Sequence, residues 1–262
     1  MQFYPGFDIS LSKDTFGFDV GEGCFDRGIE YRKLDSIRKS LRDPNCDGPE
    51  DVYAIMMDVG RTCDLEAMKE RMLLFGVVAY AEGKLGREPI RSQGHIHKVS
   101  AHCGWSTPEV YEIWQGEAVI YMQETAEDDP GRCFAVHAGP GDVVVVPPYW
   151  AHATISADCT QPLAFGAWCD RDYGFVYDGV RRHNGIAFFP VFDENNKLIW
   201  LKNPAYNDCK LVEKKPESYE QNLGIEKGKP IYTQFIEDHD KFLFFLHRNA
   251  KELCHLLLAS SA

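Results

Sequence analysis

The middle of this chain is built from short runs rich in β-branched and aromatic residues. Turn signals made of Gly, Pro, Asp and Asn separate the runs, for example at Glu82-Gly83-Lys84 and at Asp193-Glu194-Asn195-Asn196. No helical period lies between one run and the next. The pattern therefore predicts a closed barrel or sandwich of antiparallel strands between about Leu73 and Trp200. The runs are 73–84, 87–97, 109–124, 133–150, 153–168 and 186–201.

The two ends of the chain differ from this central texture, because helical spacing and polar stretches replace the strand pattern. The patterns there predict a helix over 31–41, a strand and turn over 51–64, a short helix over 65–72 capped by Asp64, an exposed excursion ending in a strand over 214–235, and a terminal amphipathic helix over 241–259.

Apolar residues make up 44% of the 262 residues, which is enough for a large core. No Pro/Ser-rich linker divides the chain. We therefore expect one domain over residues 1–262. It would consist of an N-terminal extension (1–50), a barrel (51–206) and a C-terminal extension that includes the terminal helix (207–262).

The charge balance narrows the range of partners. A formal net charge of -12 argues against nucleic acid or an anionic membrane as the main partner. It leaves an anionic small substrate open, because a site needs only a few local donors or a metal. The sequence begins without a signal-peptide pattern, and its nine cysteines contain no C-x-x-C pair. These features predict a cytoplasmic protein with reduced thiols.

One group of residues carries the chemistry. His95 and His97 flank Ile96 in a predicted strand, so both imidazoles point to the same face. Six residues separate Glu109 from Gly116. Later, five residues separate Gly141 from Pro147, and four more lead to His152.

These spacings resemble the two half-motifs of the cupin superfamily, H-x-H…E-x6-G and G-x5-P-x4-H. The resemblance implies an all-β cupin fold, a double-stranded β-helix or jelly-roll barrel with a few peripheral helices. It also implies that His95, His97, Glu109 and His152 converge on one divalent metal ion. Three imidazoles and one carboxylate suit such an ion and leave one or two coordination positions open.

The segment between His97 and Glu109 is eleven residues long, which is longer than is usual in cupins. We expect 98–107 to bulge from the barrel mouth, with His102 and Cys103 as ordinary loop residues. Glu109 is the preferred ligand over Glu112, because it fits the spacing to Gly116 and Glu112 falls on the opposite strand face.

A narrower resemblance runs from about Val52 to Tyr206. Its most specific piece is Pro147-Pro148-Tyr149-Trp150-Ala151-His152, and Asp172-Tyr173-Gly174 adds to it. These residues are similar to the cupin-type glucose-6-phosphate isomerases. The resemblance implies a homodimer that uses Fe(II) or Mn(II), with Zn(II) and Ni(II) as alternatives. It implies interconversion of a sugar phosphate between its aldose and ketose forms, as in glycolysis and gluconeogenesis.

The same resemblance assigns substrate-binding residues. By position, Ser92 and Gly94 would help to hold the phosphate, and Tyr53, Tyr149 and Tyr173 would line the substrate site. Two positions depart from the family pattern, with Val78 in place of a threonine and Arg171 in place of a histidine. Two interpretations of Arg171 stay open: it acts as a phosphate ligand, since guanidinium is a good oxyanion partner, or it forms a surface ion pair.

Glu109 is the expected base for moving a proton between C1 and C2, with Tyr149 as a positioning or relay group. A metal-assisted hydride shift is the alternative mechanism. The alternative functions are a cupin dioxygenase using Fe(II) and O2, an isomerase of a different sugar, and a non-catalytic sugar-binding cupin.

Overall fold

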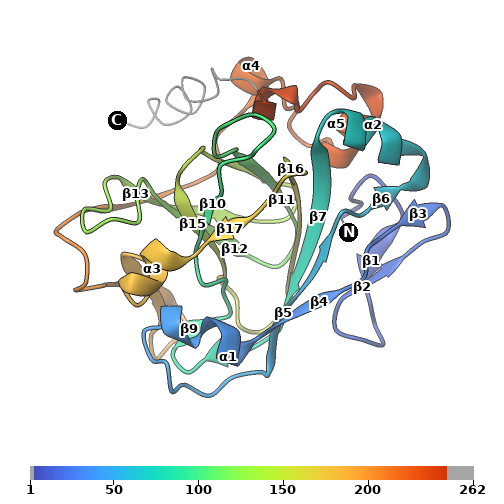
Figure 1. Cartoon of the computed structure of the whole chain (residues 1–262). Coiled ribbons are helices and arrows are strands. Elements are labelled where there is room, and N and C mark those ends of the chain that lie inside the picture. The colour runs from blue at the N-terminus through green and yellow to red at the C-terminus, as the bar shows by residue number, and fades with distance from the viewer. Residues whose placement is uncertain (1–2, 247–262) are drawn as a thin grey trace.

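The computed structural model describes residues 3–246, in which two β-sheets curve around a common core (Figure 1). The larger sheet has the order β14, β11, β16, β7, β5, β4, and all its neighbours are antiparallel. The smaller sheet has the order β15, β12, β13, β20, with β13 and β20 parallel. The bounds are β4 Glu30–Lys33, β5 Asp51–Met57, β7 Leu73–Tyr80, β11 Glu109–Gln115, β12 Ala118–Gln123, β13 Cys133–Ala138, β14 Val143–Val146, β15 Ala151–Ser156, β16 Leu163–Asp170 and β20 Leu211–Lys214.

Five two-stranded sheets and a few short helices surround these sheets. The strand pairs are β1 Ile9–Leu11 with β2 Phe18–Val20, β3 Cys24–Phe25 with β6 Gly60–Arg61, β8 Lys84–Leu85 with β9 Glu88–Pro89, β10 Ile96–His97 with β17 Phe175–Val176, and β18 Phe188–Phe192 with β19 Leu198–Lys202. The helices are α1 Leu34–Ile37, η1 Arg38–Ser40, η2 Thr62–Asp64, α2 Leu65–Glu70, α3 Asp178–Arg182, α4 Glu220–Leu223, α5 Ile231–Glu237 and η3 Leu243–Leu246.

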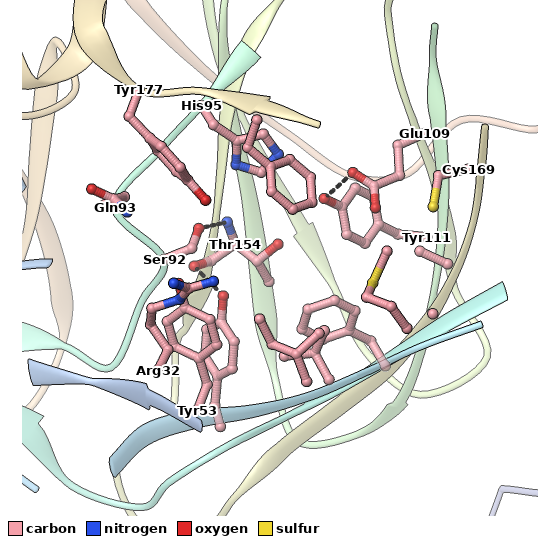
Figure 2. A pocket seen from close by; sticks show the side chains of 18 residues that line it. Arg32, Tyr53, Ser92, Gln93, His95, Glu109, Tyr111, Thr154, Cys169 and Tyr177 are labelled. Atoms are coloured by element: carbon pink, nitrogen blue, oxygen red, sulfur yellow. Dashed lines mark hydrogen bonds between the residues drawn. The ribbon is translucent and has the colours of Figure 1, made fainter. Parts of the chain in front are cut away.

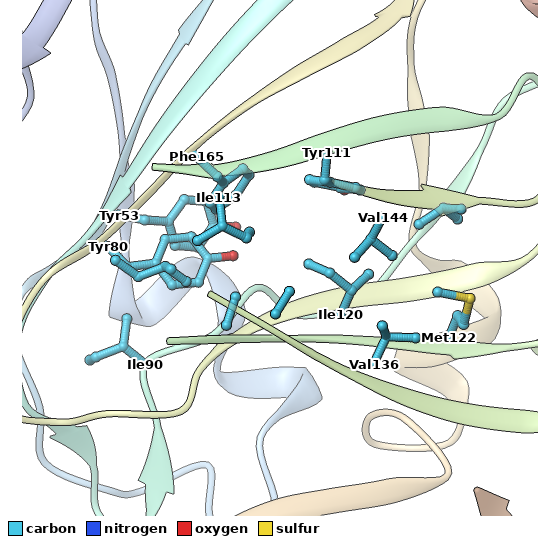
Figure 3. Packing of buried hydrophobic residues seen from close by; sticks show 14 of the residues in the cluster. Tyr53, Tyr80, Ile90, Tyr111, Ile113, Ile120, Met122, Val136, Val144 and Phe165 are labelled. Carbon is cyan, nitrogen blue, oxygen red and sulfur yellow. The ribbon is translucent and has the colours of Figure 1, made fainter. Parts of the chain in front are cut away.

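The expectation of an all-β cupin barrel with a few peripheral helices is confirmed. Every residue of β12 and β16 is buried, because both faces of the two sheets are covered. The inner face forms the barrel core, where Tyr80, Ile113, Ile120 and Phe165 pack together (Figure 3). The turns predicted at 82–84 and 193–196 follow β7 and β18, and each lies between strands.

The C-terminal extension covers the outer face of the larger sheet. The Tyr232 ring of α5 stacks on Trp168 with the ring centroids 5.5 Å apart, and it meets the edge of Phe75 at 5.2 Å. The prediction that 214–235 ends in a strand is wrong, since 231–237 is helical. Helical spacing brings Ile231, Tyr232 and Phe235 onto the sheet, and this burial overrides the strand-like composition.

The N-terminal predictions need two further corrections. Residues 30–33 form β4 rather than the start of a helix, and helical structure begins only at Leu34. Pairing with β5 decides this, because it adds a strand to the sheet edge. Asp64 stands at the start of α2 but makes no capping hydrogen bond. Its carboxylate instead pairs with Arg61 and accepts the Tyr232 hydroxyl at 3.0 Å.

The strand-and-turn prediction for 51–64 is confirmed by β5 and the turn after it. Of the helix predicted over 241–259, only the part up to 246 lies within the described residues, and 243–246 forms a short 3-10 turn there. None of the eight cysteines between 3 and 246 forms a disulfide. Within the same span, every helix is too short or too polar to cross a membrane.

Glu112 ties α5 to the barrel. Its two carboxylate oxygens accept the backbone N–H of Ile231 at 2.9 Å and the indole N–H of Trp114 at 3.1 Å. The side chain is fully buried, and burial raises the pKa of Glu112 to about 8 against these two hydrogen bonds, which lower it.

This raised pKa predicts a pH-dependent stability. Folded Glu112 keeps its proton where the unfolded chain releases it, so ionisation favours unfolding and stability falls as pH rises toward 8. Between pH 5 and pH 7 the loss is roughly 3 kcal/mol. Urea unfolding of wild type and Glu112→Gln across this range measures it. The wild type should lose stability relative to the variant, and parallel pH profiles would contradict the prediction.

Candidate metal centre

The backbone brings two separate segments of the chain together at this centre. His95 and His152 face each other across an isolated antiparallel bridge, with N···O distances of 3.0 and 2.9 Å in the two directions. His97 follows on β10, two positions from His95. Glu109 begins β11, where it pairs with Val146 of β14.

Four side chains converge on one point as a result. One ligand atom from each of His95, His97, Glu109 and His152 lies within 4.8 Å of the others, and the residues are buried or nearly so. Glu109 Oε2 lies 3.1 Å from His97 Nε2 and 3.2 Å from His152 Nε2. His95 Nε2 is buried and has no hydrogen-bond partner within the described part of the chain. An unpartnered buried nitrogen is costly unless a ligand completes it.

Hydrogen bonds made by Nδ1 of His97 and His152 leave Nε2 of each ring available to bind a cation. His97 Nδ1 lies 3.0 Å from the carbonyl of Thr107, and His152 Nδ1 lies 3.0 Å from that of Trp150. A carbonyl accepts, so the proton of each neutral ring lies on Nδ1 and the Nε2 lone pair faces the centre. Burial, together with the neighbouring His152, lowers the pKa of His95 well below its usual value, which keeps that ring neutral. This donor set fits a divalent metal ion.

Glu109 is held in place by Tyr111, two positions further along the same strand face. The Tyr111 hydroxyl donates to Glu109 Oε2 at 2.6 Å. Burial works to raise the pKa of Glu109, but the facing imidazoles of His152 and His97 hold it well below its usual range. Sequence analysis missed Tyr111, although the strand period of two places it beside Glu109. Glu112 bonds to Ile231 away from this cluster, which agrees with its expected opposite face.

The 98–107 segment is a short excursion whose end supports the centre. Val99 and Ser106 bridge its two arms, and the exposed His102 lies at its tip. Asp172 fixes it by pairing with Lys98 at 2.8 Å and accepting the N–H of Ala101. The excursion thereby positions the Thr107 carbonyl that orients His97. The Cys103 thiol lies 3.7 Å from the Trp105 carbonyl. It is not among the described residues that form the centre.

A cavity of about 640 Å³, counting its open mouth, lies beside the centre (Figure 2). Tyr53 and Ser92, both expected at the substrate, are among its lining residues. Gly94 is not, and it has a positive φ of 90° with Ile186 only 2.8 Å from where a Cβ would lie. The lining residues are Arg32, Tyr53, Ile55, Met57, Gly76, Val78, Tyr80, Ser92, Gln93, His95, Glu109, Tyr111, Thr154, Phe165, Ala167, Cys169, Phe175 and Tyr177.

Three further residues expected at the substrate lie outside this lining set. Arg171 forms a two-pronged ion pair with Asp58, at 2.8 and 2.7 Å, and both it and Tyr173 line a different hollow. Against burial, the hydrogen bonds and charge of Arg171 lower the pKa of Asp58. Tyr149 is 37% exposed and donates its backbone N–H to Ser106. Their substrate roles stay predictions, and the Arg171 guanidinium is already engaged.

Arg32, Thr154 and Tyr177 line the cavity but were not identified from the sequence. Thr154 follows His152 by two strand positions, so the same period that relates His95 to His97 indicates its face. Arg32 and Tyr177 carried no such local signal, because their positions depend on how β4 and β17 pair.

Comparison with known proteins gives a consistent result. A family model described as glucose-6-phosphate isomerase matches residues 43–208. The glucose-6-phosphate isomerase of Thermococcus litoralis is 33% identical over 200 residues, which cover 74% of this chain and 97% of that protein. The Pyrococcus furiosus protein of the same name is 32% identical over 138 residues, 53% of this chain and 67% of the relative.

Solved structures offer only partial likenesses. An oxalate oxidase superposes with a TM-score of 0.36 at 15% identity, over 48% of this chain and 54% of the other. A Bacillus subtilis oxalate decarboxylase variant gives 0.34 at 15% identity, over 60% and 32%. Scores this low carry no argument about function.

The converging side chains predict that removing one of them abolishes metal binding. We expect His152→Ala to lower metal content from about one ion per chain to near zero after dialysis, because loss of one of the four ligands weakens binding by more than the roughly 10- to 100-fold that loss of a hydrogen-bond partner behind a ligand causes. Elemental analysis by mass spectrometry after dialysis measures this. His137→Ala is the matched control, since His137 lies exposed on β13 and pairs only with Glu213 in the described structure. Full metal occupancy in His152→Ala would refute the ligand set.

Proposed function

The chain belongs to the glucose-6-phosphate isomerase family, and on this premise we propose that it interconverts glucose 6-phosphate and fructose 6-phosphate in the cavity beside its histidine cluster. The observation that carries the proposal is the convergence of four ligand atoms beside a cavity that is lined by both apolar and polar side chains and opens to solvent.

We assign the metal to His95, His97, Glu109 and His152. When bound, a divalent ion supplies a positive charge that polarises a carbonyl and stabilises charge developing on its oxygen. Fe(II) or Mn(II) is our proposed ion, with Zn(II) and Ni(II) as alternatives. A set of nitrogen and oxygen donors without a thiolate suits all four.

Glu109 is the proposed general base. It takes the proton from C2 of the open-chain aldose and returns it to C1, while a hydroxyl proton moves from O2 to O1. The Tyr111 hydroxyl holds the carboxylate in one orientation at 2.6 Å. Burial and the charge of Glu109 raise the pKa of Tyr111 well above its usual value, so this hydroxyl keeps its proton and remains a donor. The relay role of Tyr149 stays a prediction.

We further propose a single cupin domain for the chain and a homodimer as its assembly. The stacking of Tyr232 on Trp168 supports treating the C-terminal extension as part of that domain. The homodimer rests on family resemblance alone, and light scattering coupled to size-exclusion chromatography measures it.

The proposed reaction predicts a metal-dependent activity. Protein stripped with EDTA should show no conversion of fructose 6-phosphate to glucose 6-phosphate in a coupled assay. Reloading with Mn(II) or Fe(II) should restore turnover, because the polarising charge returns. The control is the stripped His152→Ala variant, which should stay inactive after the same reloading.

Absence of turnover with every metal, despite stoichiometric binding, would reject this substrate while leaving the metal centre intact. Running the reaction in D2O separates the two mechanisms. Proton transfer through Glu109 introduces deuterium at C1 or C2, whereas a hydride shift introduces none.

A further inference from the structure

An anionic substrate poses a problem for this chain, whose formal net charge is -12. A phosphate group entering the barrel leaves water and needs a local positive charge at the end of the cavity away from the metal centre. Among the described lining residues, Arg32 alone carries a permanent positive charge.

The sheet register places Arg32 inside the barrel. Arg32 of β4 pairs with Tyr53 of β5, so the two side chains are cross-strand neighbours on the face that lines the cavity. Tyr31 lies on the other face and is 40% exposed. Figure 2 shows Arg32, Tyr53 and Ser92 on one side of the cavity and Glu109 on the opposite side.

The Arg32 guanidinium interacts with the Tyr53 hydroxyl but keeps one N–H group that could bind a ligand. Its Nε is buried and has no hydrogen-bond partner among residues 3–246. Its ion pair is with Glu30 at 2.9 Å, and the Glu30 side chain is 64% exposed, so water competes with this contact. By contrast, Arg171 is committed to Asp58, and Arg181 donates its Nε to Gln93 at 2.9 Å.

We propose that Arg32 binds the phosphate group of the substrate and makes the site specific for phosphorylated sugars. The inference rests on the proposed function and deepens it. A planar guanidinium donates paired hydrogen bonds to phosphate oxygens, and the unpartnered Nε–H supplies one of them. The Tyr53 and Ser92 hydroxyls lie on the same side of the cavity as further donors.

Arg32 lies outside the segment 43–208 that the family model matches. The N-terminal extension therefore contributes a functional residue to the barrel, through the edge strand that it adds to the larger sheet. A purely structural role for Arg32, such as packing on Tyr53, would make no distinction between phosphorylated and neutral ligands.

The test uses Arg32→Gln in the metal-loaded full chain, with Lys33→Gln as the matched control. Lys33 is the next residue along the chain and carries the same charge, but it pairs with Glu50 and Asp51 outside the cavity. The measurements are kcat and KM for fructose 6-phosphate, and the Kd for glucitol 6-phosphate by calorimetry. Glucitol 6-phosphate lacks a carbonyl and cannot be isomerised.

We expect Arg32→Gln to raise KM and the Kd for glucitol 6-phosphate together by about 10- to 100-fold, the scale of a lost charge-assisted hydrogen bond. Binding of neutral glucitol should not change, and kcat should change far less than KM. Arg32→Lys should recover part of the lost affinity, because lysine restores the positive charge but not the paired N–H donors of the guanidinium. Glu30→Gln should tighten binding by freeing Arg32. Metal content serves as the check on folding.

The outcomes separate this inference from the proposed reaction. If wild type isomerises fructose 6-phosphate and Arg32→Gln matches Lys33→Gln, Arg32 is not the phosphate residue and the reaction stands. If wild type does not isomerise but binds glucitol 6-phosphate through Arg32, the reaction fails and this inference stands. If wild type binds no glucitol 6-phosphate, the inference is overturned.

Discussion

The site depends on one electrostatic constraint, which is the burial of several hydrogen-bond acceptors against one another. With Nδ1 of His97 and His152 facing backbone carbonyls, both Nε2 lone pairs point toward the Glu109 carboxylate. Acceptors at about 3 Å repel unless a cation, a proton or a metal ion, lies between them. His95 Nε2, which has no hydrogen-bond partner among the described residues, brings a further lone pair to the same point. The backbone bridge between His95 and His152 fixes this arrangement, so the chain holds the acceptors together before any ion binds.

The segments that surround the barrel serve this constraint. The excursion at 98–107 ends at the Thr107 carbonyl, and Asp172 secures it through Lys98 and the Ala101 N–H. The N-terminal extension supplies β4, the edge strand that carries Arg32 into the cavity. The C-terminal extension seals the outer face through α5, whose first N–H bonds to Glu112. Each face of β11 thus has its own acidic residue, Glu109 toward the cavity and Glu112 toward α5.

Sequence patterns predicted the barrel and the four converging residues, because strand period, turn residues and motif spacing are all local. They failed where pairing between distant segments decides the structure. Residues 31–41 have amphipathic spacing that predicts a helix, yet the part up to Lys33 forms a strand because β5 offers an open edge. Asp64 has the position of a helix cap, but Arg61 and Tyr232 engage its carboxylate. For Arg171, where the sequence left a phosphate ligand and an ion pair both open, the structure shows an ion pair, with Asp58 bonded to both terminal nitrogens. Arg32 was missed because only the β4–β5 register brings it inside.

The most direct test of the central claim is anomalous diffraction at the manganese edge from crystals of Mn(II)-loaded protein soaked with glucitol 6-phosphate. The account predicts one strong peak per chain, at about 2.0–2.3 Å from Nε2 of His95, His97 and His152 and from a carboxylate oxygen of Glu109. It also predicts the sugar in the adjoining cavity with its phosphate toward Arg32. A peak at any other position, or no peak between these four side chains, would contradict the account.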